Sequence, residues 1–158
     1  MNNIYCKDEE KTEKLGHLLG TLLSDGDVLC LSGDLGAGKT CLAKAVATAL
    51  GVSPSDVNSP TFSLMNIYKG SKLEIKHFDL YRLNSAEELE DIGFGEYVGN
   101  NGVTLIEWGE LFQEELPQEY LLVKIVKEET GRRIFLEAYG SHYKELCEKV
   151  WTLVNAGN

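Results

Sequence analysis

The alternation of apolar and polar residues divides the first third of the chain into a helix, a buried strand and a second helix. Between residues 9 and 24, leucines recur every three or four positions, which predicts an amphipathic helix with one buried face. An unbroken apolar run at residues 28–31 is typical of a strand that is covered on both faces. Helical spacing then returns from Lys39 to Leu50, and Gly51 is a natural C-terminal stop.

The rest of the chain is richer in strand patterns. Two hairpins are predicted, each from two extended segments around a short turn: residues 59–68 with 73–81, and residues 120–126 with 133–138. Ser85 and Glu88 form a capping box that opens a short helix, whereas residues 93–102 are rich in glycine and expected to be irregular. A buried strand is expected at residues 103–108, and a final helix with one apolar face at 143–154.

The connection between the first strand and the second helix carries the most specific motif. It is Gly33-Asp34-Leu35-Gly36-Ala37-Gly38-Lys39-Thr40, a phosphate-binding loop in the strand–loop–helix context that it requires. Glycines lack a Cβ, so the loop can turn its N–H groups around an anion, and the helix adds its positive dipole end. Lys39 can reach the β- and γ-phosphates, and the Thr40 hydroxyl can hold Mg²⁺. We assign nucleotide binding to Asp34, Leu35, Gly36, Ala37, Gly38, Lys39, Thr40 and Cys41.

A phosphate-binding loop also needs an acidic residue at the end of a buried strand, where it anchors Mg²⁺ or its water shell. Glu107 follows the apolar run 103–106, and Asp79 follows His77-Phe78. A carboxylate in such a position is costly unless it is paired or bound to a metal. We expect Glu107 to ligate Mg²⁺ directly, and Asp79 to act through water. A helix cap or a surface salt bridge is the alternative for either carboxylate.

Three further residues are candidates for the site. Pro60 stiffens a loop in which Thr61 presents a hydroxyl, as in switch segments that sense the γ-phosphate through Mg²⁺, although an ordinary turn has the same composition. Glu9 and Lys11 lie near the start of the first helix and are candidates for contact with the base, although a helix that only packs is the favoured interpretation. The expected catalytic residues are Lys39, Asp79, Glu107 and Thr61.

Together these patterns predict an α/β fold. We expect a P-loop NTPase-like single domain over residues 1–158, with a mixed parallel and antiparallel sheet flanked by helices. No apolar stretch is long enough to span a membrane, and the N-terminal residues lack the basic and apolar regions of a signal peptide. The four cysteines show no C-x-x-C spacing, so reduced thiols and a cytoplasmic location are expected.

The net charge of −10 limits the expected partners. An acidic chain repels a nucleic-acid backbone over most of its surface, which argues against direct binding of DNA or RNA. If RNA is involved in the function, a partner protein is expected to hold it. The local positive charge of the phosphate-binding loop is then directed at a nucleotide.

Three segments besides the loop make the chain resemble a known family. The resemblance lies in the loop and in Ser59-Pro60-Thr61-Phe62, His77-Phe78-Asp79-Leu80-Tyr81-Arg82-Leu83 and Ile106-Glu107-Trp108. Their order and spacing are similar to those of the TsaE (YjeE) family over about residues 5–140. The loop by itself would indicate only a superfamily, whereas the other three segments are much more specific.

The resemblance implies an activity and partners. Members bind ATP and Mg²⁺, hydrolyse ATP slowly by themselves, and act with TsaB and TsaD to install a threonylcarbamoyl group on adenosine 37 of tRNAs that read ANN codons. In the family pattern, Thr40 and Glu107 correspond to metal positions and Thr61 to a switch-like threonine. Asp79 and Trp108 correspond to residues tied to activity or to the nucleotide environment.

Two other functions fit a phosphate-binding loop in a chain of this length. A small-molecule kinase would need an acceptor pocket and basic residues that close over the phosphates, and only Arg82, Arg132 and Arg133 are available, none in an evident lid. A GTPase switch commonly carries Asn-Lys-x-Asp, which this sequence lacks. ATP is therefore favoured over GTP.

Overall fold

The computed structural model describes residues 3–34, 36–57 and 64–156, which form one mixed sheet flanked by helices. Its seven strands follow the order β1-β7-β6-β2-β5-β4-β3. They are β1 (Asn3–Cys6), β2 (Val28–Ser32), β3 (Met65–Lys69), β4 (Glu74–Asp79), β5 (Val103–Glu107), β6 (Tyr120–Lys127) and β7 (Arg132–Tyr139). The four central strands, β6, β2, β5 and β4, are parallel, and the outer ones pair antiparallel, so the expected mixed sheet is confirmed. The second predicted hairpin is confirmed, and so is the first from residue 65 onward, since its residues 59–63 lie outside the described part of the chain.

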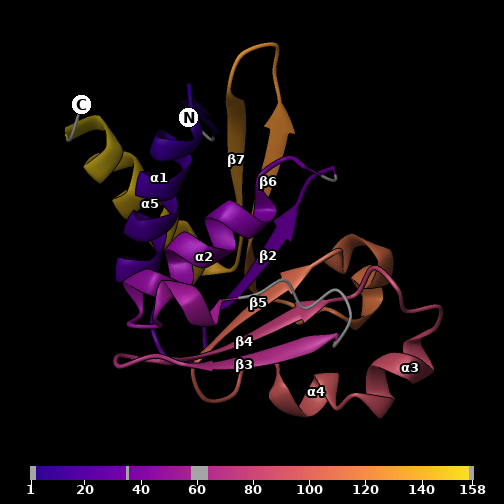
Figure 1. The fold of residues 1–158 in the computed structure, drawn as a ribbon. Coiled ribbons are helices and arrows are strands. Elements are labelled where there is room, and N and C mark those ends of the chain that lie inside the picture. Colours follow the sequence, from indigo (N-terminus) through magenta and orange to yellow (C-terminus); the bar gives the residue numbers. More distant parts are fainter. Residues whose placement is uncertain (1–2, 35, 58–63, 157–158) are drawn as a thin grey trace.

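Helices cover both faces of the sheet (Figure 1). One face carries α1 (Glu9–Leu22), α2 (Lys39–Ala49) and α5 (Ser141–Ala156), and the other carries α3 (Ala86–Asp91) and α4 (Phe94–Tyr97). Two short 3₁₀ segments, η1 (Pro54–Asp56) and η2 (Gly109–Glu115), follow α2 and β5. In the described part of the chain, no helix combines the length and apolar character that crossing a membrane requires.

The pleat of the central strands divides the core into two layers. On β5, Leu105 packs with the α1–α2–α5 layer, whereas the next residue, Ile106, packs with the α3–α4 layer. On the second side, Phe78 of β4 meets Phe94 of α4 edge-to-face, with ring centroids 5.1 Å apart. Because both faces of the parallel strands are covered, their ends are fixed in position at one edge of the sheet.

Two glycines allow α1 to lie directly against α2. A Cβ on Gly16 would lie 2.7 Å from the Cβ of Ala45, and a Cβ on Gly20 would lie 2.6 Å from that of Ala49. Real Cβ atoms do not approach so closely, so these positions require glycine for packing. The contact fixes α2, and with it the loop that leads into this helix.

The structure corrects three local predictions. Strand β1 was not expected, because four residues at a sheet edge give too short a pattern, and its partner β7 lies more than a hundred residues away. Helix α1 ends at Leu22 rather than at residue 24, since the backbone of Leu23 is extended. The glycine-rich stretch 93–102 contains the short helix α4.

Candidate functional site

The loop from Gly33 to Gly38 connects β2 to α2 and has the glycine-dependent backbone that the motif predicts. Gly33 has a φ of +152° and Gly38 a φ of +113°, values that favour glycine. A Cβ on Gly33 would also lie 2.7 Å from the carbonyl oxygen of Ile125 in β6. The loop therefore depends on glycine both for its conformation and for its contact with the neighbouring strand. Leu35 lies outside the described residues.

Lys39 is the first residue of α2, and its ammonium is buried. Among the described residues, its Nζ is the one buried side-chain nitrogen or oxygen that lacks a hydrogen-bond partner. Burial lowers the pKa of Lys39, and the nearby carboxylates of Glu107, Glu110, Asp79 and Asp34 act against this shift. A buried ammonium that lacks a hydrogen-bond partner among the described residues, beside a glycine-rich loop at the start of a helix, fits an anionic ligand such as a phosphate.

Trp108 covers the ammonium of Lys39. The Nζ atom lies 3.7 Å from the ring centroid, within the range of a cation–π interaction. Trp108 follows β5 directly and has a φ of +63°, which is uncommon for a residue with a side chain. Its ring also packs against Tyr81, with centroids 4.8 Å apart. The residue that the family resemblance singled out thus lies beside the predicted phosphate-binding lysine.

The two predicted acidic residues end neighbouring parallel strands. Asp79 is the last residue of β4, Glu107 is the last residue of β5, and the two are direct partners in the strand register. Leu31 of β2 is also paired with Glu107, so the loop that starts after β2 leaves the sheet at the same edge. Both carboxylates are buried, and Asp79 accepts a hydrogen bond from the backbone N–H of Tyr81 at 3.0 Å. The strand-end placement inferred from the sequence is confirmed for both residues.

These residues offer the ligands that a magnesium–nucleotide complex requires. Thr40, exposed in the first turn of α2, supplies a hydroxyl, and Glu107 and Asp79 supply carboxylates. Hydroxyl and carboxylate oxygens are hard ligands of the kind that Mg²⁺ prefers. The donor set therefore fits the cation, and Lys39 fits the phosphates. Thr61 lies outside the described residues.

Two side chains at the site were named in the sequence analysis but were not assigned to the nucleotide or metal site. His77 of β4 lies 2.6 Å from Glu107, between its Nε2 and the Oε2 of the carboxylate. Arg132, at the start of β7, donates hydrogen bonds to the carbonyl oxygens of Ala37 and Gly36 in the loop. The spacing of His77 two residues before Asp79 was available as a signal, whereas the Arg132 contact depends on the long-range pairing of β6 with β2.

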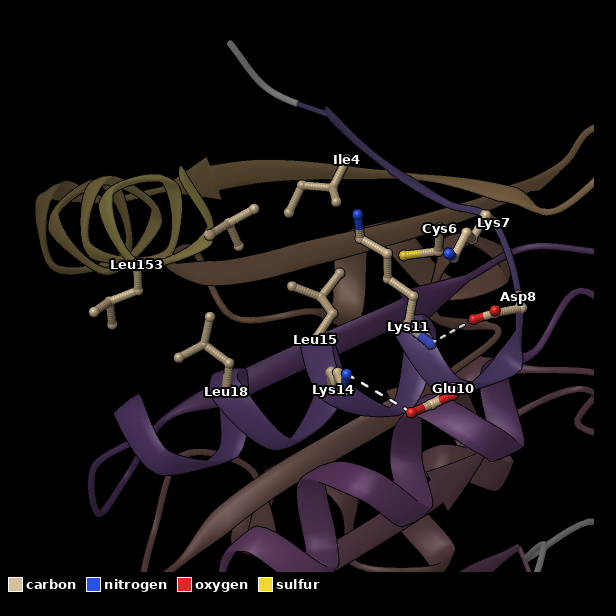
Figure 2. A pocket seen from close by; sticks show the side chains of 11 residues that line it. Ile4, Cys6, Lys7, Asp8, Glu10, Lys11, Lys14, Leu15, Leu18 and Leu153 are labelled. Carbon is tan, nitrogen blue, oxygen red and sulfur yellow. Dashed lines mark hydrogen bonds and ion pairs between the residues drawn. The ribbon is translucent and has the colours of Figure 1, made fainter. Parts of the chain in front are cut away.

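Glu9 and Lys11 lie on different sides of α1. Two carboxylates and a thiol lie close together between α1 and α2. One oxygen of Glu9, one oxygen of Glu13 and the Sγ of Cys41 all lie within 4.8 Å of one another. Burial, together with the charges of Glu9 and Glu13, raises the pKa of Cys41 to about 11. Lys11 instead lines a pocket of about 400 Å³ between β1, α1 and α5, whose lining includes Ile4, Leu15 and Leu153 (Figure 2). Glu9 and Cys41 are thus neighbours beside the loop helix, and Lys11 is turned away from them.

Comparison with known proteins identifies the family. A family model described as "Threonylcarbamoyl adenosine biosynthesis protein TsaE" matches residues 6–135. The chain belongs to the TsaE family. It is 41% identical over 150 residues to the tRNA threonylcarbamoyladenosine biosynthesis protein TsaE of Bacillus subtilis, covering 94% of this chain and 93% of that protein. The TsaE of Treponema pallidum is 41% identical over 119 residues, which cover 75% of this chain and 87% of the relative.

A solved structure has the same fold. The crystal structure of YdiB from Bacillus subtilis superposes with a TM-score of 0.79 at 33% sequence identity, covering 95% of this chain and 93% of that one. The fold and family expected from the sequence motifs are confirmed.

Proposed function

We propose that this TsaE family member is a Mg²⁺-dependent ATPase that acts in forming the threonylcarbamoyl group on adenosine 37 of tRNAs that read ANN codons. The observation that carries the proposal is the buried ammonium of Lys39 at the strand edge where Asp79 and Glu107 end. The names of the Bacillus subtilis and Treponema pallidum relatives support the tRNA modification pathway. The sequence lacks the Asn-Lys-x-Asp motif of guanine-selective proteins, which favours ATP and ADP as ligands.

Each residue of the site has a separate role in phosphoryl transfer. The loop N–H groups and Lys39 bind the phosphates and offset the charge that develops on them. Thr40 and Glu107 would hold Mg²⁺, which supplies further charge stabilisation to the phosphates when it is bound. Asp79 orients water at the same edge of the sheet. Positioning and electrostatics carry such reactions, so none of these side chains needs to form a covalent bond.

We infer that the partners are TsaB and TsaD, and that tRNA is contacted through them. The net charge of −10 opposes a direct interaction with the tRNA backbone. In this proposal the chain hydrolyses ATP slowly by itself, and the partners raise the rate. A change in the bound nucleotide then alters the contacts with the partners.

The test is ATP hydrolysis by the chain alone, and with TsaB, TsaD and tRNA added. Low turnover alone and a clear rise with the partners are expected, and Lys39→Ala should abolish both because it removes the charge that faces the phosphates. Unchanged turnover in Lys39→Ala would refute the assignment. If a small metabolite alone raised turnover and became phosphorylated, a kinase would replace the proposed ATPase.

A further inference from the structure

We propose that His77 is a positioning residue that holds the carboxylate of Glu107 ready for the divalent cation, at the end of a hydrogen-bond chain that begins on β3. The inference rests on the proposed function, because it takes Glu107 as a ligand of Mg²⁺. It assigns a role to three side chains, His77, Tyr68 and Asn66, that the motifs do not explain.

The contact between His77 and Glu107 is short and excluded from water. The His77 side chain is 1% exposed and that of Glu107 6% exposed, and Nε2 lies 2.6 Å from Oε2. The two residues come from neighbouring parallel strands. His77 is paired with Leu105, which lies two residues before Glu107 and on the same face of the sheet. An ionised carboxylate only accepts hydrogen bonds, so Nε2 of His77 is the donor.

The other ring nitrogen of His77 continues the chain. With the proton on Nε2, a neutral ring leaves Nδ1 as an acceptor, and the Tyr68 hydroxyl lies 3.4 Å from it. The Asn66 side-chain N–H₂ in turn donates to the Tyr68 oxygen at 3.3 Å. All three donors are therefore oriented toward Glu107. Such chains polarise their members in one direction, which strengthens the last hydrogen bond.

The second oxygen of Glu107 is left for a ligand. The hydrogen bond from His77 reaches the Oε2 atom of the Glu107 carboxylate, so the contact uses one of its two oxygens. A carboxylate held by one oxygen keeps a fixed orientation and can offer the other oxygen to a cation. Removing the hydrogen-bond partner of a metal-ligating residue typically weakens metal binding about 10- to 100-fold.

A second histidine–carboxylate pair provides a matched control. His142 of α5 lies 2.8 Å from Asp27, but its side chain is 50% exposed, and Asp27 precedes β2 at the opposite end of that strand from the loop. Both pairs join a histidine to a buried carboxylate across elements. Only the pair formed by His77 involves a residue at the candidate metal site.

The experiment measures Mn²⁺ binding, as a probe for Mg²⁺, to the complex of the protein with ADP by the electron paramagnetic resonance signal of free Mn²⁺. His77→Leu should weaken Mn²⁺ binding about 10- to 100-fold while metal-free ADP affinity stays unchanged. His77→Gln, which retains a donor N–H, should restore most of the affinity. His142→Leu should leave Mn²⁺ affinity at the wild-type value. A folded His77→Leu protein with wild-type Mn²⁺ affinity would overturn the inference.

Two more variants make every outcome decisive. If His77→Leu does not fold, Tyr68→Phe decides, because it keeps the ring and removes the donor to His77. We expect weaker Mn²⁺ binding by Tyr68→Phe, and equal binding overturns the inference. Glu107→Gln separates the inference from the proposed function. If Glu107→Gln binds Mn²⁺ as well as the wild type, the metal assignment fails and the inference fails with it. If Glu107→Gln weakens binding and the His77 variants do not, only the inference fails.

Discussion

The ammonium of Lys39 lies 3.7 Å from the ring centroid of Trp108 and has no hydrogen-bond acceptor among the described residues. A desolvated cation–π contact contributes about 2 kcal/mol, less than several charge-assisted hydrogen bonds to a phosphate would. A nucleotide phosphate should therefore displace the ring as the main partner of the ammonium. The fluorescence of Trp108 should therefore show whether the Lys39 ammonium lies against the ring or binds a phosphate.

Nucleotide binding should change the fluorescence of Trp108. The chain contains one other tryptophan, Trp151 in α5, so Trp151→Phe leaves Trp108 as the single tryptophan, which excitation at the red edge of its absorption selects over the tyrosines. In that background, Mg²⁺ and ADP should shift or change the intensity of the emission, because the charge next to the ring moves. The same titration of a Trp108→Phe protein that retains Trp151 should show almost no change. Constant Trp108 emission while ADP binding is observed calorimetrically would refute the displacement.

Lys39→Met should raise thermal stability while it removes nucleotide binding. Burial lowers the pKa of Lys39, so the folded chain holds this proton less strongly than the unfolded chain does. Below the lowered pKa, the charged lysine costs stability; as the pH rises through that value toward 10.5, the cost disappears. The gain in melting temperature for Lys39→Met should thus be largest at neutral pH and shrink in alkaline buffer. A lower melting temperature for the variant at pH 7 would contradict this account.

Cys41 should react slowly with iodoacetamide, and nucleotide should slow it further. With a pKa of about 11, about one Cys41 thiol in a thousand is ionised at pH 8, so the rate should rise about tenfold per pH unit up to pH 10. Glu9→Gln should accelerate the reaction because it removes a neighbouring negative charge. Peptide mapping by mass spectrometry identifies the modified cysteine, and the buried Cys30 is an internal control. Equal reaction rates with and without ADP would show that Cys41 does not lie at the nucleotide site.

Gly33→Ala should destabilise the fold by about 1–3 kcal/mol. The new Cβ would meet the Ile125 carbonyl at 2.7 Å, and φ at this position is +152°. Gly95→Ala in α4 is the matched control, because a Cβ there has no neighbour within 4 Å, and its effect should be close to neutral. Urea unfolding measures both. Equal stability of the two variants would show that the loop is not held against β6 as described.

The site divides into features that the sequence could predict and features that it could not. The loop motif is contiguous, and Glu107 is recognisable because it ends an apolar strand, whereas Asp79 ends a strand that is less uniformly apolar. Parallel strands then place both carboxylates at one edge without further information. The motif therefore identifies the phosphate-binding part of the site before any coordinates are known.

The remaining features depend on long-range pairing or on single backbone angles. Trp108 reaches Lys39 because its own φ is +63°, an angle that no local pattern predicts for tryptophan. Arg132 reaches the loop because β6 pairs with β2 and carries β7 beside it. The contact between His77 and Glu107 follows from the register of β4 on β5. His77 and Trp108 are visible in the sequence beside Asp79 and Glu107, but the contacts that they make are not.

The most direct test of a magnesium–nucleotide site built on the loop and Glu107 is calorimetric titration of ATP with Mg²⁺ and with EDTA. The wild type should bind ATP about tenfold or more tightly with Mg²⁺ present, and Glu107→Ala should lose that advantage while it keeps its metal-free affinity. Circular dichroism confirms that the variant is folded. The same gain from Mg²⁺ in both proteins, or no gain in the wild type, would contradict the proposed site.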